Sequence, residues 1–296
     1  MKQFWLALFL LQVCFMDISI VQSAEPEHPI QLIYAQSIQG QDPTQQYPVE
    51  LLKQAFDAVG VSVNLVGTDA PMVQQRSLKA IAADKTIDVF WSLTNQEREE
   101  LLLPVRIPID KGLYGWRILL LAAHRATPLG DIRSLADLKQ LNLLQGHDWP
   151  DTEILRYHHL NVQTSTQYQS LFTMLAKQRA DAFPRSVLEV WQEIARYPSM
   201  YKVDQQVVIK YQTALYYFFH KDNQQLAKKL EEGLNLMIAD GSFDVLFQQY
   251  FGEDIAKTCL AKRRVISIEN PFLPVATPIH REELWFQPDS ALCQTP

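Results

Sequence analysis

The segment LLQGHDWPDTEIL, residues 143–155, concentrates groups that could do chemistry. An apolar pair is followed by Gly146, and His147, Asp148 and Asp151 come soon after it. Such a cluster could ligate a metal or form a catalytic pair. Alternatively, a strand that turns sharply into a helix could cradle a ligand, because the first turn of a helix leaves backbone N–H donors unpaired.

The residues around this segment favour the cradle. Pro150 suits the first turn of a helix predicted over residues 152–159, and a neighbouring aspartate would cap that helix. A metal would need further convergent ligands, and the nearest, His158 and His159, point apart because adjacent helical residues do not share a face. A plain capped turn and a metal or catalytic site remain the alternatives. The candidate ligand-binding residues here are Gly146, His147, Asp148 and Trp149.

Hydrophobic periodicity places this segment within an alternating α/β chain. Strands are predicted at residues 30–36, 61–66 and 87–91, with a helix over 47–59 and a second helix that starts at Pro71. This β-α-β-α-β order predicts a parallel sheet with right-handed crossovers. Further strands are predicted at residues 117–123, 141–144, 181–184 and 213–220, and helices at 134–139, 168–178, 187–196, 224–239 and 243–251. From Lys262 on, the Pro-rich tail is predicted to be an irregular wrap.

Composition limits the classes of protein that the chain could be. Its 296 residues suit one large domain or two lobes of ordinary size. The net charge is -6, and the short run Lys262-Arg263-Arg264 is the main basic cluster. Nucleic acid is therefore not expected as a partner, since phosphate contacts need clustered Lys and Arg. Nucleotide fingerprints of the GxGxxG or GxxxxGK[ST] type are absent from the sequence, and no cofactor is predicted.

The N-terminus is typical of an export signal. Lys2 precedes an apolar run over residues 4–15, and Ser23 and Ala24 are small enough to flank a cleavage point. We predict a signal peptide over residues 1–24 and a periplasmic mature protein; a buried helix or an uncleaved anchor is the alternative. The mature chain would keep Cys259 and Cys293, which could bridge in an oxidising compartment or stay as free thiols.

The order of several motifs resembles family 3 periplasmic solute-binding proteins, the class that includes amino-acid receptors of ABC importers. The matching stretches are IDVFWSLTNQEREELLLPVRIPIDKGLYGWRILLL, SLADLK, MLAKQRADAFPRS and IADGSFDVLFQQYFG, and the resemblance covers about residues 28–252. It implies an α/β, two-lobed type II periplasmic binding protein fold with a hinge and an interlobe cleft. The implied division is lobe 1 over residues 25–116 and 213–252, lobe 2 over 117–212, and a C-terminal tail over 253–296 that wraps the body.

The resemblance also assigns roles to the polar turn after the third strand. Arg98 matches the family arginine that pairs with a ligand carboxylate, a task that suits a guanidinium fork. Thr94 and Asn95 lie in the same turn, and Asn95 stands where the family usually has a hydroxyl residue. A solvated arginine at a helix start is the alternative for Arg98. Replacing Arg98 by Ala is expected to lower ligand affinity about 30-fold or more.

The sequence departs from the amino-acid receptors at RADAFPRS. Where those receptors usually carry a carboxylate for the ligand ammonium, this chain has Ser186, preceded by Arg185. This favours an anionic, or at least non-zwitterionic, ligand, although Arg185 could instead point to solvent. Aromatic residues near the expected cleft could stack on a ring-bearing ligand or belong to the core; they are Tyr34, Trp91, Tyr114, Trp116 and Trp149.

The resemblance implies a solute-binding protein, not an enzyme. It would act as a monomer and deliver a small solute to an inner-membrane permease or report it to a sensor. The alternatives are an enzyme on the same fold, similar to cyclohexadienyl dehydratases, and an orphan regulatory subunit. An enzyme would need a positioned acid or base in the cleft, for which His147, Asp148 and Glu189 are the candidates.

Overall fold

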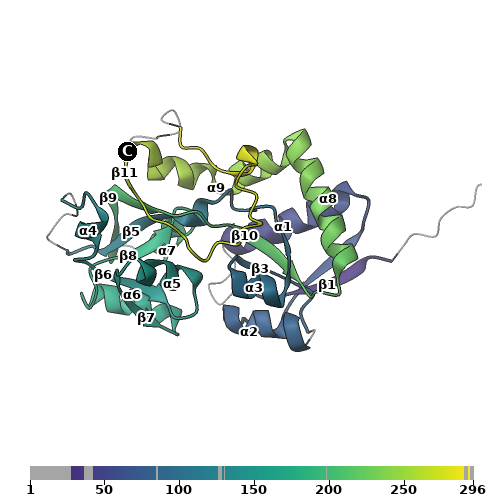
Figure 1. The fold of residues 1–296 in the computed structure, drawn as a ribbon, viewed down its shortest axis with the longest axis horizontal. Helices are drawn as coiled ribbons and strands as arrows, with labels where there is room; N and C mark the ends of the chain where they lie inside the picture. The colour runs from purple at the N-terminus through teal and green to yellow at the C-terminus, as the bar shows by residue number, and fades with distance from the viewer. Residues whose placement is uncertain are drawn as a thin grey trace, which may run out of the picture.

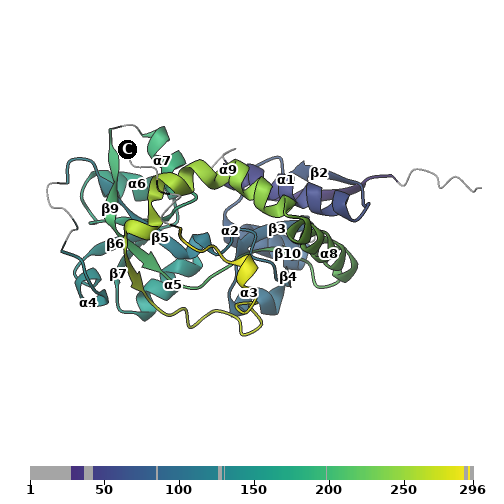
Figure 2. The ribbon, with the colours of Figure 1, turned by 90° about the horizontal axis from the view of Figure 1, so that it is seen from above.

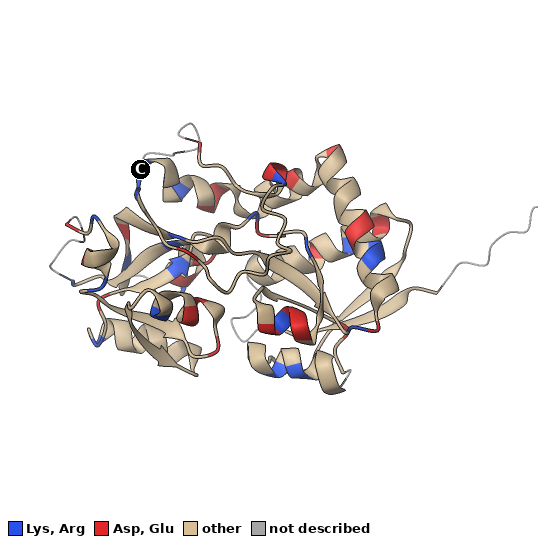
Figure 3. Ribbon diagram, viewed as in Figure 1, with Lys and Arg blue, Asp and Glu red and all other residues tan. Residues whose placement is uncertain are grey.

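The computed structural model describes residues 28–36, 43–84, 86–125, 129, 131–197, 199–289 and 293. The predicted signal peptide, residues 1–24, lies outside this part of the chain. The described residues form two α/β lobes that lie side by side (Figure 1). Within them, no helix combines the length and the apolar character that a membrane crossing requires. Lys and Arg are interspersed with Asp and Glu over both lobes (Figure 3).

Lobe 1 is built on a five-stranded sheet in the order β2-β1-β3-β10-β4. Its strands β1, β2 and β3 are parallel, as the β-α-β-α-β prediction requires, whereas β10 inserts antiparallel between β3 and β4. Strands β3 and β10 are buried at every position, which explains their nearly continuous apolar sequences VFWSL and LYYFF. The elements are β1 (Ile30–Tyr34), α1 (Pro43–Ala58), β2 (Val63–Gly67), α2 (Gln74–Lys79) with a π-helical turn (Ala80–Asp84), β3 (Val89–Leu93), α3 (Gln96–Leu101), β4 (Leu103–Val105), β10 (Leu215–Phe219) and α8 (Gln224–Asp240).

Lobe 2 has a four-stranded sheet in the order β11-β9-β5-β8 and a parallel pair, β6 and β7, which a bridge between Leu143 and Ala182 connects to it. The short helix α4 begins with the predicted capping box, because Ser134 and Asp137 bond each other's backbone N–H groups. The elements are β5 (Trp116–Ala122), α4 (Leu135–Leu138), β6 (Asn142–Gly146), α5 (Pro150–Tyr157), β7 (Asn161–Ser165), α6 (Tyr168–Ala176), β8 (Phe183–Ser186), α7 (Val190–Arg196), β9 (Tyr201–Lys210) and β11 (Arg264–Ser267).

Two crossings join the lobes, over residues 106–115 and 211–214. They lie side by side, since the Tyr211 N–H donates to the Gly115 carbonyl at 3.0 Å. Helix α9 (Ser242–Thr258) reaches from lobe 1 to lobe 2 (Figure 2). Near its lobe-2 end the Gln192 amide of α7 donates to the Asp254 carboxylate at 3.4 Å.

The predicted elements are confirmed in type and order, but five α-helices and strands of the described residues were missed. These are α3, β4, β7, β9 and β11. The prediction of a wholly irregular tail is wrong at β11, where residues 264–267 pair in parallel with β9. Strand β9, YKVDQQVVIK, was hard to recognise because the polar run Asp204-Gln205-Gln206 interrupts its apolar pattern.

Candidate ligand-binding site

A cavity of about 1020 Å³, counting its open mouth, lies between the two lobes. Lobe 1 lines it with residues that include Gln74 and Trp91, and the first crossing contributes Tyr114. Lobe 2 contributes the turn at Gly146 and a group of charged residues. We call this group the charged wall; it consists of the lining residues Arg117, Asp151, Arg185 and Glu189, and of Glu193, which pairs with Arg185. The cavity therefore occupies the place where lobes of this kind take a small ligand, with strand ends and a helix start facing it.

The turn from β6 into α5 is shaped by Gly146 and Trp149. A Cβ atom at Gly146 would lie 2.4 Å from the Trp149 ring, so only glycine lets the indole fold back over the turn. The Thr152 hydroxyl donates to the Gly146 carbonyl at 2.7 Å, and Trp149 stacks on Phe183 with centroids 6.2 Å apart. Trp149 and Pro150 both line the cavity, so the start of α5 faces it.

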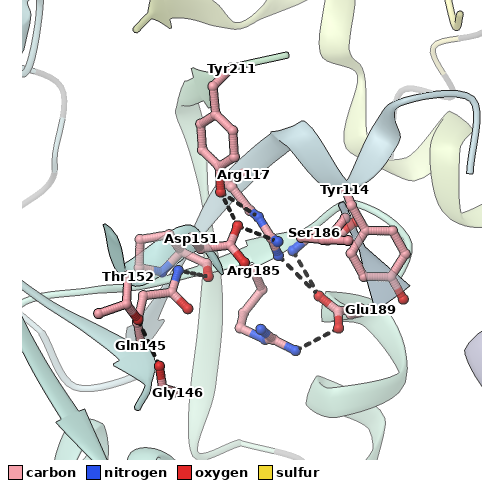
Figure 4. A network of polar contacts seen from close by, with 12 residues as sticks. Tyr114, Arg117, Gln145, Gly146, Asp151, Thr152, Arg185, Ser186, Glu189 and Tyr211 are labelled. Atoms are coloured by element: carbon pink, nitrogen blue, oxygen red, sulfur yellow. Dashed lines mark hydrogen bonds and ion pairs between the residues drawn. The ribbon is translucent and has the colours of Figure 1, made fainter. Parts of the chain in front are cut away.

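Arg117 of β5 is a buried member of the charged wall (Figure 4). Its Nη2 lies 2.5 Å from Asp151 Oδ1, its Nη1 3.2 Å from Glu189 Oε2, and its Nε 3.0 Å from the Tyr211 hydroxyl. The Tyr211 hydroxyl also donates to Asp151. Burial lowers the pKa of Arg117, but Asp151, Tyr211 and Glu189 outweigh this effect, so the pKa lies above its ordinary value. Arg117 is thus held charged between two carboxylates.

Arg185 of β8 is equally buried, and it too is paired. Its Nη2 lies 2.9 Å from Glu189 Oε1 and 2.6 Å from Glu193 Oε1, and its Nε donates to both Glu193 oxygens. The Tyr168 hydroxyl donates to the same Glu193 at 2.6 Å, and the guanidinium lies 4.8 Å from the Trp149 ring centroid. Glu189 therefore joins the two arginines (Figure 4).

The wall carries more carboxylates than guanidinium groups. Arg117 and Arg185 face Asp151, Glu189 and Glu193, which leaves one formal negative charge in excess when all are ionised. Burial raises the pKa of Glu189, an effect that both arginines oppose. The groups that reach the cavity surface alternate in sign, since Asp151, Arg117, Glu189 and Arg185 all line it.

The structure brings together part of the site that the sequence predicted. Of the candidate residues, Trp91, Gly146, Asp148, Trp149 and Arg185 line the cavity. The others lie in the described part of the chain but outside the lining. Tyr34 packs on Trp91, the Thr94 hydroxyl donates to Glu99 at 2.7 Å, Asn95 caps α3, His147 is exposed, and the Ser186 N–H donates to Glu189 at 3.2 Å.

Arg98 lies behind the cavity wall, and its fork is directed at protein acceptors. Nη1 donates to the Ser92 hydroxyl and the Leu93 carbonyl at 2.5 and 2.7 Å, and Nη2 donates to Gln74 Oε1 at 3.1 Å. Nη2 also reaches across to the Asp148 carbonyl of lobe 2 at 3.4 Å. Burial lowers the pKa of Arg98 to about 10, against the effect of Asp148. In this structure Arg98 therefore links the lobes through Asp148.

Asp148 is the point at which the lobes touch across the mouth. Its carboxylate accepts from the backbone N–H of Gln75 in lobe 1 at 3.3 Å, in addition to the contact of its carbonyl with Arg98. Among the described residues, no group of three or more His, Cys, Asp and Glu side chains is arranged to hold a metal ion.

Sequence reasoning missed Arg117 and Asp151 as lining residues, and it considered Glu189 only for catalysis. A signal for Arg117 was present, since it is the one charged residue in the strand WRILLLA. A charge within an otherwise apolar, buried strand needs a buried partner or a functional site. The partners Asp151 and Glu189 could not be read from spacing, because they come from α5 and the turn before α7.

Comparisons with known proteins agree with this architecture. No family model matches the sequence, and no curated protein matches it either. Among solved structures, it is similar to an ancestral arginine-binding protein bound to arginine, with a TM-score of 0.56 and 17% identity over 75% of this chain and 98% of that one. A histidine kinase sensor domain with similarity to periplasmic binding proteins has a TM-score of 0.56 and 14% identity, over 76% of this chain and 96% of its own.

A third similar structure is an ancestral amino-acid-binding protein that is a precursor of cyclohexadienyl dehydratase. Its TM-score is 0.54 and its identity 17%, over 75% of this chain and 95% of that one. Together these structural similarities identify the class of fold: the chain has the two-lobed type II periplasmic-binding-protein fold. The resemblance to family 3 solute-binding proteins is thereby confirmed at the level of the fold.

Proposed function

We propose that the chain is a periplasmic solute-binding protein that captures a small carboxylate-bearing solute between its lobes. It presents the solute, as a monomer, to an ABC-type importer or to a sensor. The observation that carries this proposal is the charged wall, in which Asp151, Arg117, Glu189 and Arg185 alternate along a cavity between two lobes. The similar structures include the substrate-binding protein of an amino acid ABC transporter and a histidine kinase sensor domain, and these support delivery to an importer and to a sensor, respectively.

The ion pairs within the charged wall change the charge that we expect of the ligand. The argument from sequence for a purely anionic ligand depended on an uncompensated Arg185, and Glu189 and Glu193 compensate it. A lone anion entering this wall would meet an excess of carboxylates, and like charges at close range repel. We therefore favour a solute with a carboxylate and a basic nitrogen, so that each group of the ligand finds an opposite charge.

Native mass spectrometry of gently purified protein should first reveal which small molecule travels with the chain. Calorimetry then compares that solute with two close analogues, one amidated at the carboxylate and one acetylated at the basic nitrogen. Each change removes one charge-assisted contact, so each should weaken binding by about tenfold or more. Equal affinity of the acetylated analogue would favour an anionic ligand. Equal affinity of both analogues would remove the charged wall from recognition.

A lyase on the same fold is the second candidate. It is favoured by Glu189, a carboxyl that lines the cavity and whose pKa is raised by burial, because a carboxyl in a cavity can serve in general acid–base catalysis. One of the similar structures is also a precursor of a cyclohexadienyl dehydratase. A hydroxycyclohexadiene carboxylate becomes aromatic when its ring carboxylate leaves as carbon dioxide and its protonated hydroxyl leaves as water, so incubation with such a compound should raise ultraviolet absorbance. An unchanged spectrum, with the compound recovered intact, counts against the lyase.

A further inference from the structure

The tail after α9 begins on lobe 2. Strand β11 joins the lobe-2 sheet beside β9, and the next residue, Ile268, donates its N–H to the Lys210 carbonyl at 2.9 Å. The Glu269 carbonyl then lies 2.7 Å from Nε2 of His158, in the turn after α5. The start of this segment is therefore fixed to the second lobe.

The same segment next contacts both crossings between the lobes. The Asn270 side chain donates to the Gln212 carbonyl at 2.9 Å, in the second crossing. Further on, the Phe286 N–H donates to the Lys111 carbonyl at 2.9 Å, in the first crossing. We name residues 268–286 the strap, because this stretch runs from lobe 2 over both crossings to lobe 1 (Figure 2).

The first crossing has the backbone of a hinge where the strap meets it. Lys111 and Gly112 both adopt left-handed conformations, with φ of 52° and 72°. Trp285 of the strap lies directly over Gly112, where a Cβ atom would come within 2.6 Å of the indole ring. Its Nε1 donates to the Pro278 carbonyl at 3.0 Å. Hinges absorb large changes in φ and ψ at a few such residues, so a side chain packed on them opposes the change.

Two further contacts hold the tail in place. Leu284 is 1% exposed, and the next residue, Trp285, packs against a hydrophobic cluster of lobe 1 that includes Phe90 and Phe218. Beyond the strap, Cys293 is joined by a disulfide to Cys259 at the end of α9, 34 residues earlier. The tail is therefore anchored in lobe 2, in lobe 1 and again on α9.

We propose that the strap restrains the hinge, so that the lobes stay close together even without ligand. The lobes of this chain would then separate only as far as the contacts at Trp285 and Asn270 allow. This inference goes beyond the proposed function, since it concerns the motion of the lobes and holds whatever the solute is. It also assigns the tail a role in setting how readily the cavity opens.

The distance between the lobes in ligand-free protein tests the proposal. Spin labels are introduced through non-natural residues at the exposed positions Glu231 of lobe 1 and Gln140 of lobe 2, which leaves the disulfide intact. Distance distributions are then recorded by pulsed electron resonance. The strap variant is Trp285→Ala, and its matched control is Val275→Ala, a fully exposed residue of the same segment.

Wild type and Val275→Ala should share one narrow distribution, whereas Trp285→Ala should broaden it and shift it to longer distances. Asn270→Ala, which loses one hydrogen bond, should give a smaller change of the same sign. Should Trp285→Ala fail to fold, Asn270→Ala and the paired Cys259→Ser, Cys293→Ser variant decide the question by the same measurement. The proposal is overturned if the folded strap variants give the wild-type distribution, or if wild type itself samples the longer distances.

Discussion

Removing Glu193 offers a direct test of the charged wall, because this carboxylate has no part in lining the cavity. It is 3% exposed and accepts hydrogen bonds from Arg185 Nε at 2.8 Å, Arg185 Nη2 at 2.6 Å and the Tyr168 hydroxyl at 2.6 Å. In Glu193→Ala the buried Arg185 keeps one partner, Glu189, at 2.9 Å. Tyr168 loses this acceptor entirely.

The loss can be sized from the chemistry of buried ion pairs. Breaking such a pair costs about 3–5 kcal/mol, because a charge is left in the interior without its partner. Since Glu189 still compensates Arg185, we expect the lower end, about 3 kcal/mol. For a chain of this size that corresponds to a fall in melting temperature of about 5 °C. Glu193→Gln keeps acceptor capacity for Tyr168 and should lose less.

Urea unfolding followed by circular dichroism measures this free energy, with the melting temperature as a second reading. The matched control is Asp57→Ala, which breaks the exposed pair of Asp57 with Lys53, and such a pair contributes about 0.5 kcal/mol. A Glu193→Ala variant as stable as this control would refute the reasoning. It would mean that Arg185 finds water or another acceptor as readily as it found Glu193.

Four other predictions concern separate features. Arg98→Ala should weaken solute binding by less than about tenfold in calorimetry, because the guanidinium lies behind the lining; a loss of 30-fold would restore it as the anchor. Burial raises the pKa of Asp110 to about 6, so its contribution to stability is complete below pH 4 and is lost as pH rises through 6. Between pH 4 and 7 wild type should therefore lose on the order of 3 kcal/mol relative to Asp110→Asn, and parallel pH profiles would contradict this. Gly146→Ala should cost about 1–3 kcal/mol in urea unfolding by displacing the indole, and a neutral result would show that the turn adapts. Cys259 and Cys293 should resist alkylation until a reductant is added, and intact mass showing two labelled thiols without reductant would contradict the bridge.

The sequence was most informative where one local rule decided the outcome. Helix α4 begins at its predicted capping box because Ser134 and Asp137 satisfy each other's backbone donors within one turn. The parallel start of lobe 1 followed from the alternation of strands and amphipathic helices, and the wholly buried β10 from its apolar run. Strand β11 was missed, since its four residues, RVIS, are a strand only because β9 offers them an edge.

The candidate site was harder to predict, because its charges act in pairs that tertiary structure creates. Arg98 has the residue type and position of an anion anchor, yet acceptors from α2 and β3 occupy its fork. Asn95 caps the helix that carries Arg98, a local task that explains its polarity without a ligand. In both cases the sequence identified a polar residue at the correct end of the sheet, and packing decided which partner it meets.

The same reasoning explains why the charge of one residue is a poor guide to the ligand. Arg185 and Ser186 replace an expected carboxylate, which suggested an anion site when the strand was considered alone. Glu189 follows four residues after Arg185, beyond the end of β8, and the chain turns back so that its carboxylate joins both buried arginines. Burying an unpaired guanidinium group would cost several kcal/mol. A chain that buries two arginines must therefore bury carboxylates beside them. For the proposed ligand, a solute that carries both signs of charge disturbs these ion pairs least.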